Sequence, residues 1–327
     1  MTAPAAPLPG GPSRKALTAD GAAGRGDRAF GLVALLAGLL VLLVLALIAI
    51  ATTNEAWPAF REEGLSFVTS DDWVPAEGRF GALAFIYGTL LVSAIAVLFA
   101  VPVSLGIALF ANEAASNRLR RPVVYVLDLL AAIPSVVYGL WGILVLAPAL
   151  RPVFDSVGDA VDGVPVLDTL FGTGSSGRSF LTAGLILAVM ITPIITSLSR
   201  EVIATVPNSQ REAAYGMGAT RWEMIRAAVL PWSRGGIVGA VMLGLGRAMG
   251  ETIAVALVVG SSAQITLDLF APGDTMAAVI ANEFGEASGT YRSALIGLGV
   301  VLFVVTILVN VAARGIVTRM DRRARGA

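Results

Sequence analysis

Two charged residues, Arg247 and Glu251, lie inside an apolar stretch in the last third of the chain. Each charge held at the middle of a bilayer costs about 2.5–3.5 kcal/mol on insertion scales, so such residues mark function by default. Four residues apart, they are expected on one face of a helix. Glycines at small-xxx-small spacing would let a partner helix approach this segment, so that the charged face points into a bundle and away from lipid. These glycines are Gly235, Gly239, Gly246 and Gly250.

The pair suits recognition of an oxyanion. Arginine presents a planar fork of N–H donors that matches phosphate oxygens. The carboxylate of Glu251 can accept a hydrogen bond from the proton that phosphate, unlike sulfate, still carries near neutral pH, and this would favour phosphate. The alternative is structural: Arg247 and Glu251 neutralise each other and lock the bundle.

A second unusual segment, residues 211–231, connects two apolar stretches. A short helix carrying large side chains at helical spacing can lie in a groove of another protein. Gly216 and Gly218 would permit a turn after that helix, and Pro231 would mark the entry into the next span. The alternative is an interfacial helix lying on the bilayer. The large side chains expected to be exposed are Tyr215, Met217, Trp222 and Met224.

Composition identifies the elements that position these segments. The chain of 327 residues is 56% hydrophobic and 14% charged, against roughly 45–50% and 25% in soluble domains. We therefore predict an all-α integral membrane protein. Six apolar stretches reach spanning length: 30–52, 82–110, 123–149, 180–198, 237–260 and 294–313. Residues 1–29 are rich in Pro, Gly and Ala and are expected to form a disordered tail, and residues 321–327 a second tail.

The distribution of charge predicts the orientation. Segments 1–29, 111–122, 199–234 and 314–327 hold 17 of the 23 basic residues, and the opposite side holds five basic and 14 acidic residues. The positive-inside rule therefore places both termini, and the 199–234 loop, in the cytoplasm.

Residue types also exclude several chemistries. The chain has no Cys and no His, which removes disulfides, most zinc sites and a histidine base. Its one lysine, Lys15, is not part of a Walker A motif. We expect no enzyme activity, metal, cofactor or nucleic-acid partner, and any ATP used would be bound by another subunit.

The 211–231 segment resembles the EAA loop of bacterial binding-protein-dependent ABC importer permeases. Ala228 departs from the pattern, which usually has Ile there. The resemblance implies the six-helix fold of type I ABC importer permeases over residues 30–320. Its coupling loop, 199–234, would dock on the ATPase with Tyr215 among the contacts. The residues in register are Glu212, Ala213, Ala214, Gly218, Leu230 and Pro231.

From about residue 80 onward, the chain further resembles the C-type permeases of phosphate-specific (Pst) importers. The matching segments are 119–122 (LRRP), 129–142 (LLAAIPSVVYGLWG), 243–252 (LGLGRAMGET) and 281–284 (ANEF). The resemblance implies an inorganic phosphate importer of the bacterial inner membrane. Its partners would be an A-type permease, two ATPase subunits and an extracytoplasmic phosphate-binding protein, and Arg247 and Glu251 would correspond to the family's intramembrane pair.

Three alternatives stay open at this point. One is a permease of the same fold for sulfate or molybdate. An ion-coupled secondary transporter is another, although that class usually shows internal repeats and several intramembrane acids. The third is a membrane scaffold or sensor that transports nothing.

Overall fold

The computed structural model describes residues 25–172 and 175–325. Of the predicted tails, residues 1–24 and 326–327 lie outside the described residues. Residues 25–29 and 321–325 are instead helical, as the start of the first described helix and the end of the last, so the tails are shorter than predicted. Contacts divide the chain into two units, 1–51 and 52–327. Helix α2 (Arg25–Glu63) begins in the first unit and ends in the second. Six described helical segments are long and apolar enough to span a membrane, which confirms the predicted number. They are Ala29–Glu63, Leu83–Ala114, Ser135–Val161, Phe180–Ala204, Arg221–Met249 and Gly289–Gly315.

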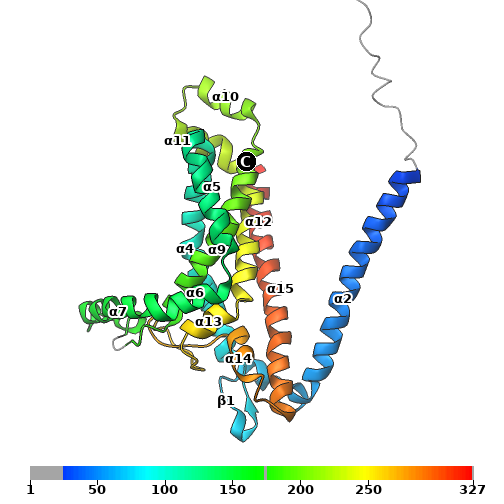
Figure 1. The fold of residues 1–327 in the computed structure, drawn as a ribbon, viewed down its shortest axis with the longest axis vertical. Helices are drawn as coiled ribbons and strands as arrows, with labels where there is room; N and C mark the ends of the chain where they lie inside the picture. The colour runs from blue at the N-terminus through cyan, green and yellow to red at the C-terminus, as the bar shows by residue number, and fades with distance from the viewer. Residues whose placement is uncertain (1–24, 173–174, 326–327) are drawn as a thin grey trace, which may run out of the picture. The chain divides into compact units, whose positions relative to one another are not determined.

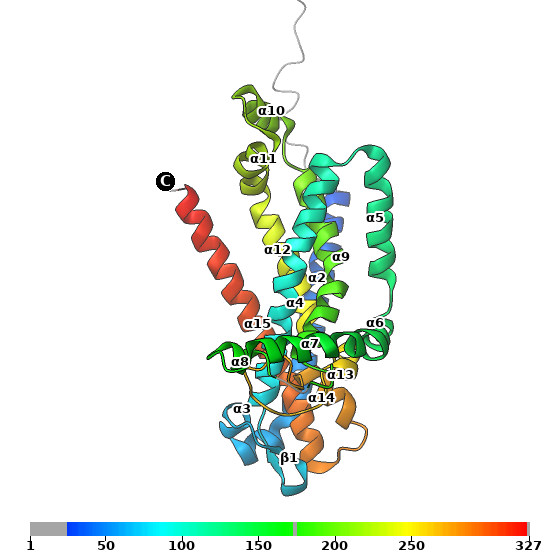
Figure 2. The same ribbon diagram turned by 90° about the vertical axis from the view of Figure 1, so that its left-hand side faces the viewer.

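The centre of the second unit is the packing of α4 (Leu83–Leu109) against α9 (Phe180–Ala204). Gly184 makes this approach possible, because a Cβ there would overlap the Ile95 side chain. The fifth span packs on α9 in the same way, since Gly236 lies against Val202. Small residues thus bring three spans close together around one apolar core. Figures 1 and 2 show the three helices α4, α9 and α12 (Leu230–Met249) side by side.

The third predicted span, 123–149, is wrong in its limits because its helix is broken. Helix α5 (Asn117–Ala132) ends before Pro134. The helical segment that is long and apolar enough to span a membrane consists instead of α6 (Ser135–Trp141), the π-helical turn η3 (Gly142–Leu146) and α7 (Ala147–Val161). Proline has no N–H to donate to the carbonyl four residues earlier. That carbonyl, of Leu130, instead accepts a bond from the Tyr138 hydroxyl at 2.8 Å. In Figure 2, α7 runs across the bundle below α5.

The fifth predicted span, 237–260, is also wrong in its limits. Helix α11 (Arg221–Met224), the π-helical turn η4 (Ile225–Val229) and α12 (Leu230–Met249) form one continuous rod. It passes through Pro231, and η4 ends two residues before that proline, just as η3 ends two residues before Pro148. Such π-helical turns absorb a break in the hydrogen-bond ladder. The rod then stops at Met249, and α13 (Ile253–Val258) is a separate helix.

Short elements close the end of the bundle opposite α10 (Asn208–Gly216). We call these two ends the β1 end and the α10 end. At the β1 end, Trp73 pairs with Phe80 in an antiparallel two-stranded sheet and packs edge-on against Phe85. The elements there are α3 (Ser66–Thr69), β1 (Trp73–Val74), η1 (Pro75–Glu77), β2 (Arg79–Phe80), α14 (Met276–Glu283) and the start of α15 (Gly289–Arg325). Two elements elsewhere are η2 (Phe110–Ala114) and α8 (Leu167–Leu170).

Candidate functional site

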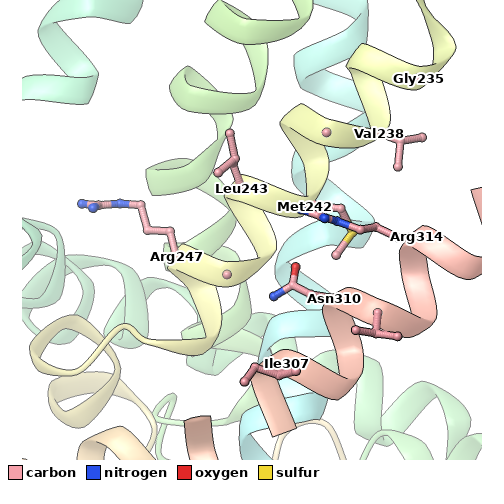
Figure 3. Close-up of a pocket in the computed structure, with 11 residues that line it drawn as sticks. Gly235, Val238, Met242, Leu243, Arg247, Ile307, Asn310 and Arg314 are labelled. Carbon is pink, nitrogen blue, oxygen red and sulfur yellow. The ribbon is translucent and has the colours of Figure 1, made fainter. Parts of the chain in front are cut away.

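Arg247 lies in the last turn of α12, and its side chain is exposed. It lines a groove of about 880 Å³ between α12 and α15, together with Asn310 and Arg314. In Figure 3 the guanidinium group extends away from Asn310 and Arg314, so that it is directed outward from this pair of helices. The cation is therefore available to a group that approaches α12 from outside the chain.

Glu251 does not share a helical face with Arg247, which corrects the prediction from their spacing. Because α12 ends at Met249, Glu251 belongs to the turn before α13, and its Oε1 accepts a bond from the Ala254 N–H at 3.4 Å. Three ion pairs occur among the residues that the structure describes, and none joins Arg247 to Glu251. The structural alternative, mutual neutralisation, is thus not seen in this chain.

The broken helix explains how two charges can lie here without pairing. The C-terminal end of a helix carries partial negative charge and the N-terminal end partial positive charge. Arg247 is at the C-terminal end of α12, and Glu251 is at the N-terminal end of α13. Each charge is therefore stabilised by the helix end beside it.

Glu251 lines a narrow crevice whose polar members come from distant parts of the sequence. Thr89 and Ser93 are one turn apart on α4, and both are buried, as is Thr275. The Thr89 hydroxyl accepts a bond from the Met276 N–H at 3.0 Å. Sequence reasoning missed these hydroxyl groups. Their only signal was a Thr and a Ser four residues apart in an apolar span.

The glycines of α12 divide into two sets. Gly244, like Gly236, packs against α9, since a Cβ at this position would overlap the Ile195 side chain. Gly235, Gly239 and Gly246 meet nothing within 4 Å. Three glycines of the predicted stripe are therefore unfilled by this chain and leave room for another helix, while Gly250 is the C-cap residue that follows the end of α12.

The predicted coupling segment forms a helix–turn–helix on the surface. Glu212 and Ala213 are exposed on α10, while Ala214 is buried beneath the helix. The turn that follows needs Gly218, whose φ of 82° lies in the left-handed region. The Ala219 N–H then donates to the Ala214 carbonyl at 3.1 Å. Leu230 is half-buried and Pro231 exposed at the start of α12.

Three of the four large side chains predicted to be exposed are so. Tyr215 is 47% exposed, Trp222 62% and Met217 84%. Met224 is only 1% exposed and packs with Ile203 in the apolar cluster below α10, so its prediction is wrong. The reason is helical geometry: Ala214 and Met224 occupy the inner faces of α10 and α11, and hold the segment on the bundle.

An ion pair that sequence reasoning missed also fixes this segment. Arg211 Nη2 donates to Glu113 Oε1 at 2.9 Å, with side-chain exposures of only 18% and 7%. Arg211 further donates to the backbone carbonyls of Val206 and Ile203. Glu113 lies in η2, 98 residues away in sequence. Nothing in the local pattern around either residue indicates the partner.

A further polar cavity, of about 560 Å³, opens at the β1 end and is lined in part by Asp274, Glu283 and Asn282. Asp274 is 5% exposed, and its Oδ1 accepts a bond from the Thr275 N–H at 2.7 Å. Burial raises the pKa of Asp274 to about 7; the bond from Thr275 lowers it and the charge of Glu283 raises it further.

A bundle of six spans, with an exposed helix–turn–helix between the fourth and fifth, is the architecture of an ABC importer permease. One chain of a bacterial alginate ABC transporter aligns with a TM-score of 0.60 at 18% identity, covering 90% of this chain and 96% of that one. A chain of an inward-facing MetNI methionine ABC transporter aligns with a TM-score of 0.54 at 17% identity, covering 72% and 94%.

The particular family follows from the sequence. Residues 101–326 match the family described as the binding-protein-dependent transport system inner membrane component, and the chain belongs to that family. The phosphate transport system permease protein PstC of Mesorhizobium japonicum is 46% identical, over 91% of each chain. The protein of the same name from Xylella fastidiosa is 45% identical, over 87% of this chain and 90% of its own. PstC 2 of Mycobacterium tuberculosis is 43% identical, over 89% and 92%.

Proposed function

We propose that this chain is the permease subunit of an ATP-driven importer of inorganic phosphate in the bacterial inner membrane. The observation that carries the proposal is the outward-directed guanidinium group of Arg247, on a spanning helix of a family member whose relatives are named as phosphate permeases. A fixed cation in a low-dielectric passage compensates the charge of a phosphate ion. Its affinity must be modest, because the ion also has to leave.

Glu251 would supply selectivity and not charge compensation. Its crevice is lined by the hydroxyl groups of Thr89, Ser93 and Thr275. A carboxylate here would accept a hydrogen bond from the proton of hydrogen phosphate. Sulfate has no such proton, so its oxygen would face the carboxylate without a hydrogen bond. Because Arg247 is on α12 and Glu251 is in the turn before α13, a movement of α13 relative to α12 would change the distance between them.

The assembly follows from the surfaces that the chain leaves open. An A-type permease would approach the stripe of Gly235, Gly239 and Gly246 to complete the path. Two ATPase subunits would dock at the α10 end, which would face the cytoplasm together with both termini. The phosphate-binding protein would dock at the β1 end. ATP would be hydrolysed by the ATPase subunits, and the permease itself would hold no cofactor.

Uptake of labelled phosphate by cells that carry the Arg247→Gln variant tests the site. We expect uptake to be abolished while the variant reaches the membrane at the normal level. An Arg151→Gln control, at an exposed position of α7 that does not line the groove of Arg247, should transport normally. Uptake by Arg247→Gln at the rate of the unmodified protein would refute the site.

Competition by sulfate tests the substrate. In the unmodified protein, a hundredfold excess of sulfate should leave phosphate uptake unchanged, and Glu251→Gln should make uptake sensitive to it. Strong competition by sulfate in the unmodified protein would favour the permease for another oxyanion.

Co-purification tests the docking surface. Gly218→Trp puts a large side chain into the left-handed turn after α10, so the ATPase should be lost from the purified complex. Gly285→Trp adds the same bulk at the β1 end, where a Cβ also meets open space, and should retain the ATPase. Equal recovery of the ATPase with both variants would contradict the docking role.

A further inference from the structure

A cavity of about 500 Å³ lies at the α10 end, away from the groove that Arg247 lines. We call it the α5 arginine cavity. One face of α5 provides most of its lining, since positions four residues apart on a helix share a face. The end of α9 provides the rest. The lining residues are Arg120, Arg121, Val124, Tyr125, Asp128 and Arg200.

The cavity holds more positive charge than its own carboxylate balances. Three arginines line it against a single acidic residue, Asp128, and none of these four side chains takes part in the three ion pairs found among the described residues. Arg120 and Arg121 also lie near the N-terminal end of α5, whose first turn has no acidic residue. The partial positive charge of that helix end adds to theirs.

One of the arginine side chains, that of Arg120, is held in position by a neutral side chain. Arg120 Nη2 donates to Asn112 Oδ1 at 3.3 Å, and Asn112 Nδ2 donates to the Arg200 carbonyl at 2.7 Å. Asn112 thereby ties the start of α5 to the end of α9 without neutralising any charge. Each guanidinium group has five N–H donors, so most of the donors of Arg120 remain free.

We propose that the α5 arginine cavity binds a phosphate group. Guanidinium groups bind phosphate oxygens through paired, charge-assisted hydrogen bonds, and basic pockets between spans on the cytoplasmic side suit anionic headgroups. Asp128 is eight residues beyond Arg120 on α5, a rise of about 12 Å. Its carboxylate can therefore stay clear of an anion at the arginines.

Two sources can supply that group. One is the headgroup of an anionic phospholipid, whose acyl chains would contact the exposed Tyr125, Val126 and Leu129 on α5. The other is inorganic phosphate leaving the transport path, and this source rests on the proposed function. Binding assays without transport separate the two, because each probe is offered alone.

The experiment compares the Arg120→Gln/Arg121→Gln double variant with an Arg118→Gln control. Arg118 is in the same turn of α5 and exposed, but does not line the cavity. Each protein is purified with its native partner subunits and stripped of lipid. Native mass spectrometry then counts phosphatidylglycerol retained from nanodiscs of phosphatidylglycerol and phosphatidylcholine, and equilibrium dialysis measures labelled inorganic phosphate.

We expect the double variant to bind at least one of the two probes about tenfold more weakly, since two sets of charge-assisted hydrogen bonds are removed. Arg118→Gln should stay within twofold of the unmodified protein. A loss confined to phosphatidylglycerol identifies the lipid source, and a loss confined to phosphate identifies the transported ion. Equal loss in the control and the double variant, or unchanged binding of both probes in the double variant, would overturn the proposal. Arg247→Gln should keep this binding even where it abolishes uptake, so the two proposals fail separately.

Discussion

The ion pair between Arg211 and Glu113 predicts how firmly α10 is held on the bundle. The change to make is Arg211→Met, which keeps most of the aliphatic stem and removes the charge. Glu113 is 7% exposed, so its carboxylate would be left buried without a cation. Removing one partner of a buried pair costs about 3–5 kcal/mol. The loss of the Arg211 bonds to the carbonyls of Val206 and Ile203 acts in the same direction.

Hydrogen–deuterium exchange of the α10 amides measures this cost locally. At the lower limit of about 3 kcal/mol, the equilibrium constant for local opening of α10 rises more than a hundredfold. The matched control is Arg79→Met, because Arg79 and Asp72 are 51% and 59% exposed. Such exposed pairs contribute about 0–1 kcal/mol, so exchange near β2 should change by less than about fivefold.

A double-mutant cycle completes the test. Arg211→Met/Glu113→Leu should restore much of the lost protection, because it removes the buried charge together with its partner. Protection of α10 within twofold of the unmodified protein in Arg211→Met alone would show that the pair does not hold the segment. Equal exchange in the single and double variants would show that the buried carboxylate is not the cause.

Three further predictions concern stability in detergent. Gly88→Ala places a Cβ against the Asp274 carbonyl oxygen and should lower the free energy of unfolding by about 1–3 kcal/mol. Gly106→Ala on the same helix meets open space and should raise it by up to about 1 kcal/mol; equal melting temperatures would refute this contrast. Burial raises the Asp274 pKa from 3.8 to about 7, so folding loses up to about 4 kcal/mol as pH rises through that interval. Asp274→Asn should flatten thermal stability between pH 5 and 8, and an unchanged slope would contradict the assignment. Met224→Ala should lower the free energy of unfolding by about 2–5 kcal/mol, because Met224 is buried, and Met217→Ala should lower it by less than about 0.5 kcal/mol, because Met217 is exposed. Equal losses of melting temperature in the two variants would count against the observed burial.

Much of the fold was predictable because lipid imposes one strong constraint. A spanning helix satisfies its backbone internally and needs about 20 apolar residues, so hydropathy finds it. The same signal does not show where a helix breaks inside an apolar run. The sequence shows Pro134. It does not show that the Tyr138 hydroxyl donates a hydrogen bond to the Leu130 carbonyl, which this proline cannot bond. Gly250 directly follows Met249 and is a typical signal for the end of a helix, but in a segment rich in glycine it did not single out this position.

The candidate site was predictable in its residues and not in its geometry. Arg247 and Glu251 were identified by the cost of charge in an apolar segment, yet their arrangement depended on the helix break between them. Thr89 and Ser93 line the same crevice as Glu251 only because of how α4 packs. Met224 was misplaced for a related reason: a helix period gives the faces of α11, but tertiary contacts decide which face is covered.

The turn between α10 and α11 also bears on the thermodynamics of assembly. Gly218 in the left-handed region, the capping box of Thr220 and Glu223, and the buried Ala214 and Met224 give this segment its shape within the single chain. A surface that is already folded has no ordering entropy to lose when a partner arrives. Its association should therefore show the modest negative heat-capacity change of rigid docking, and not the large one of coupled folding and binding.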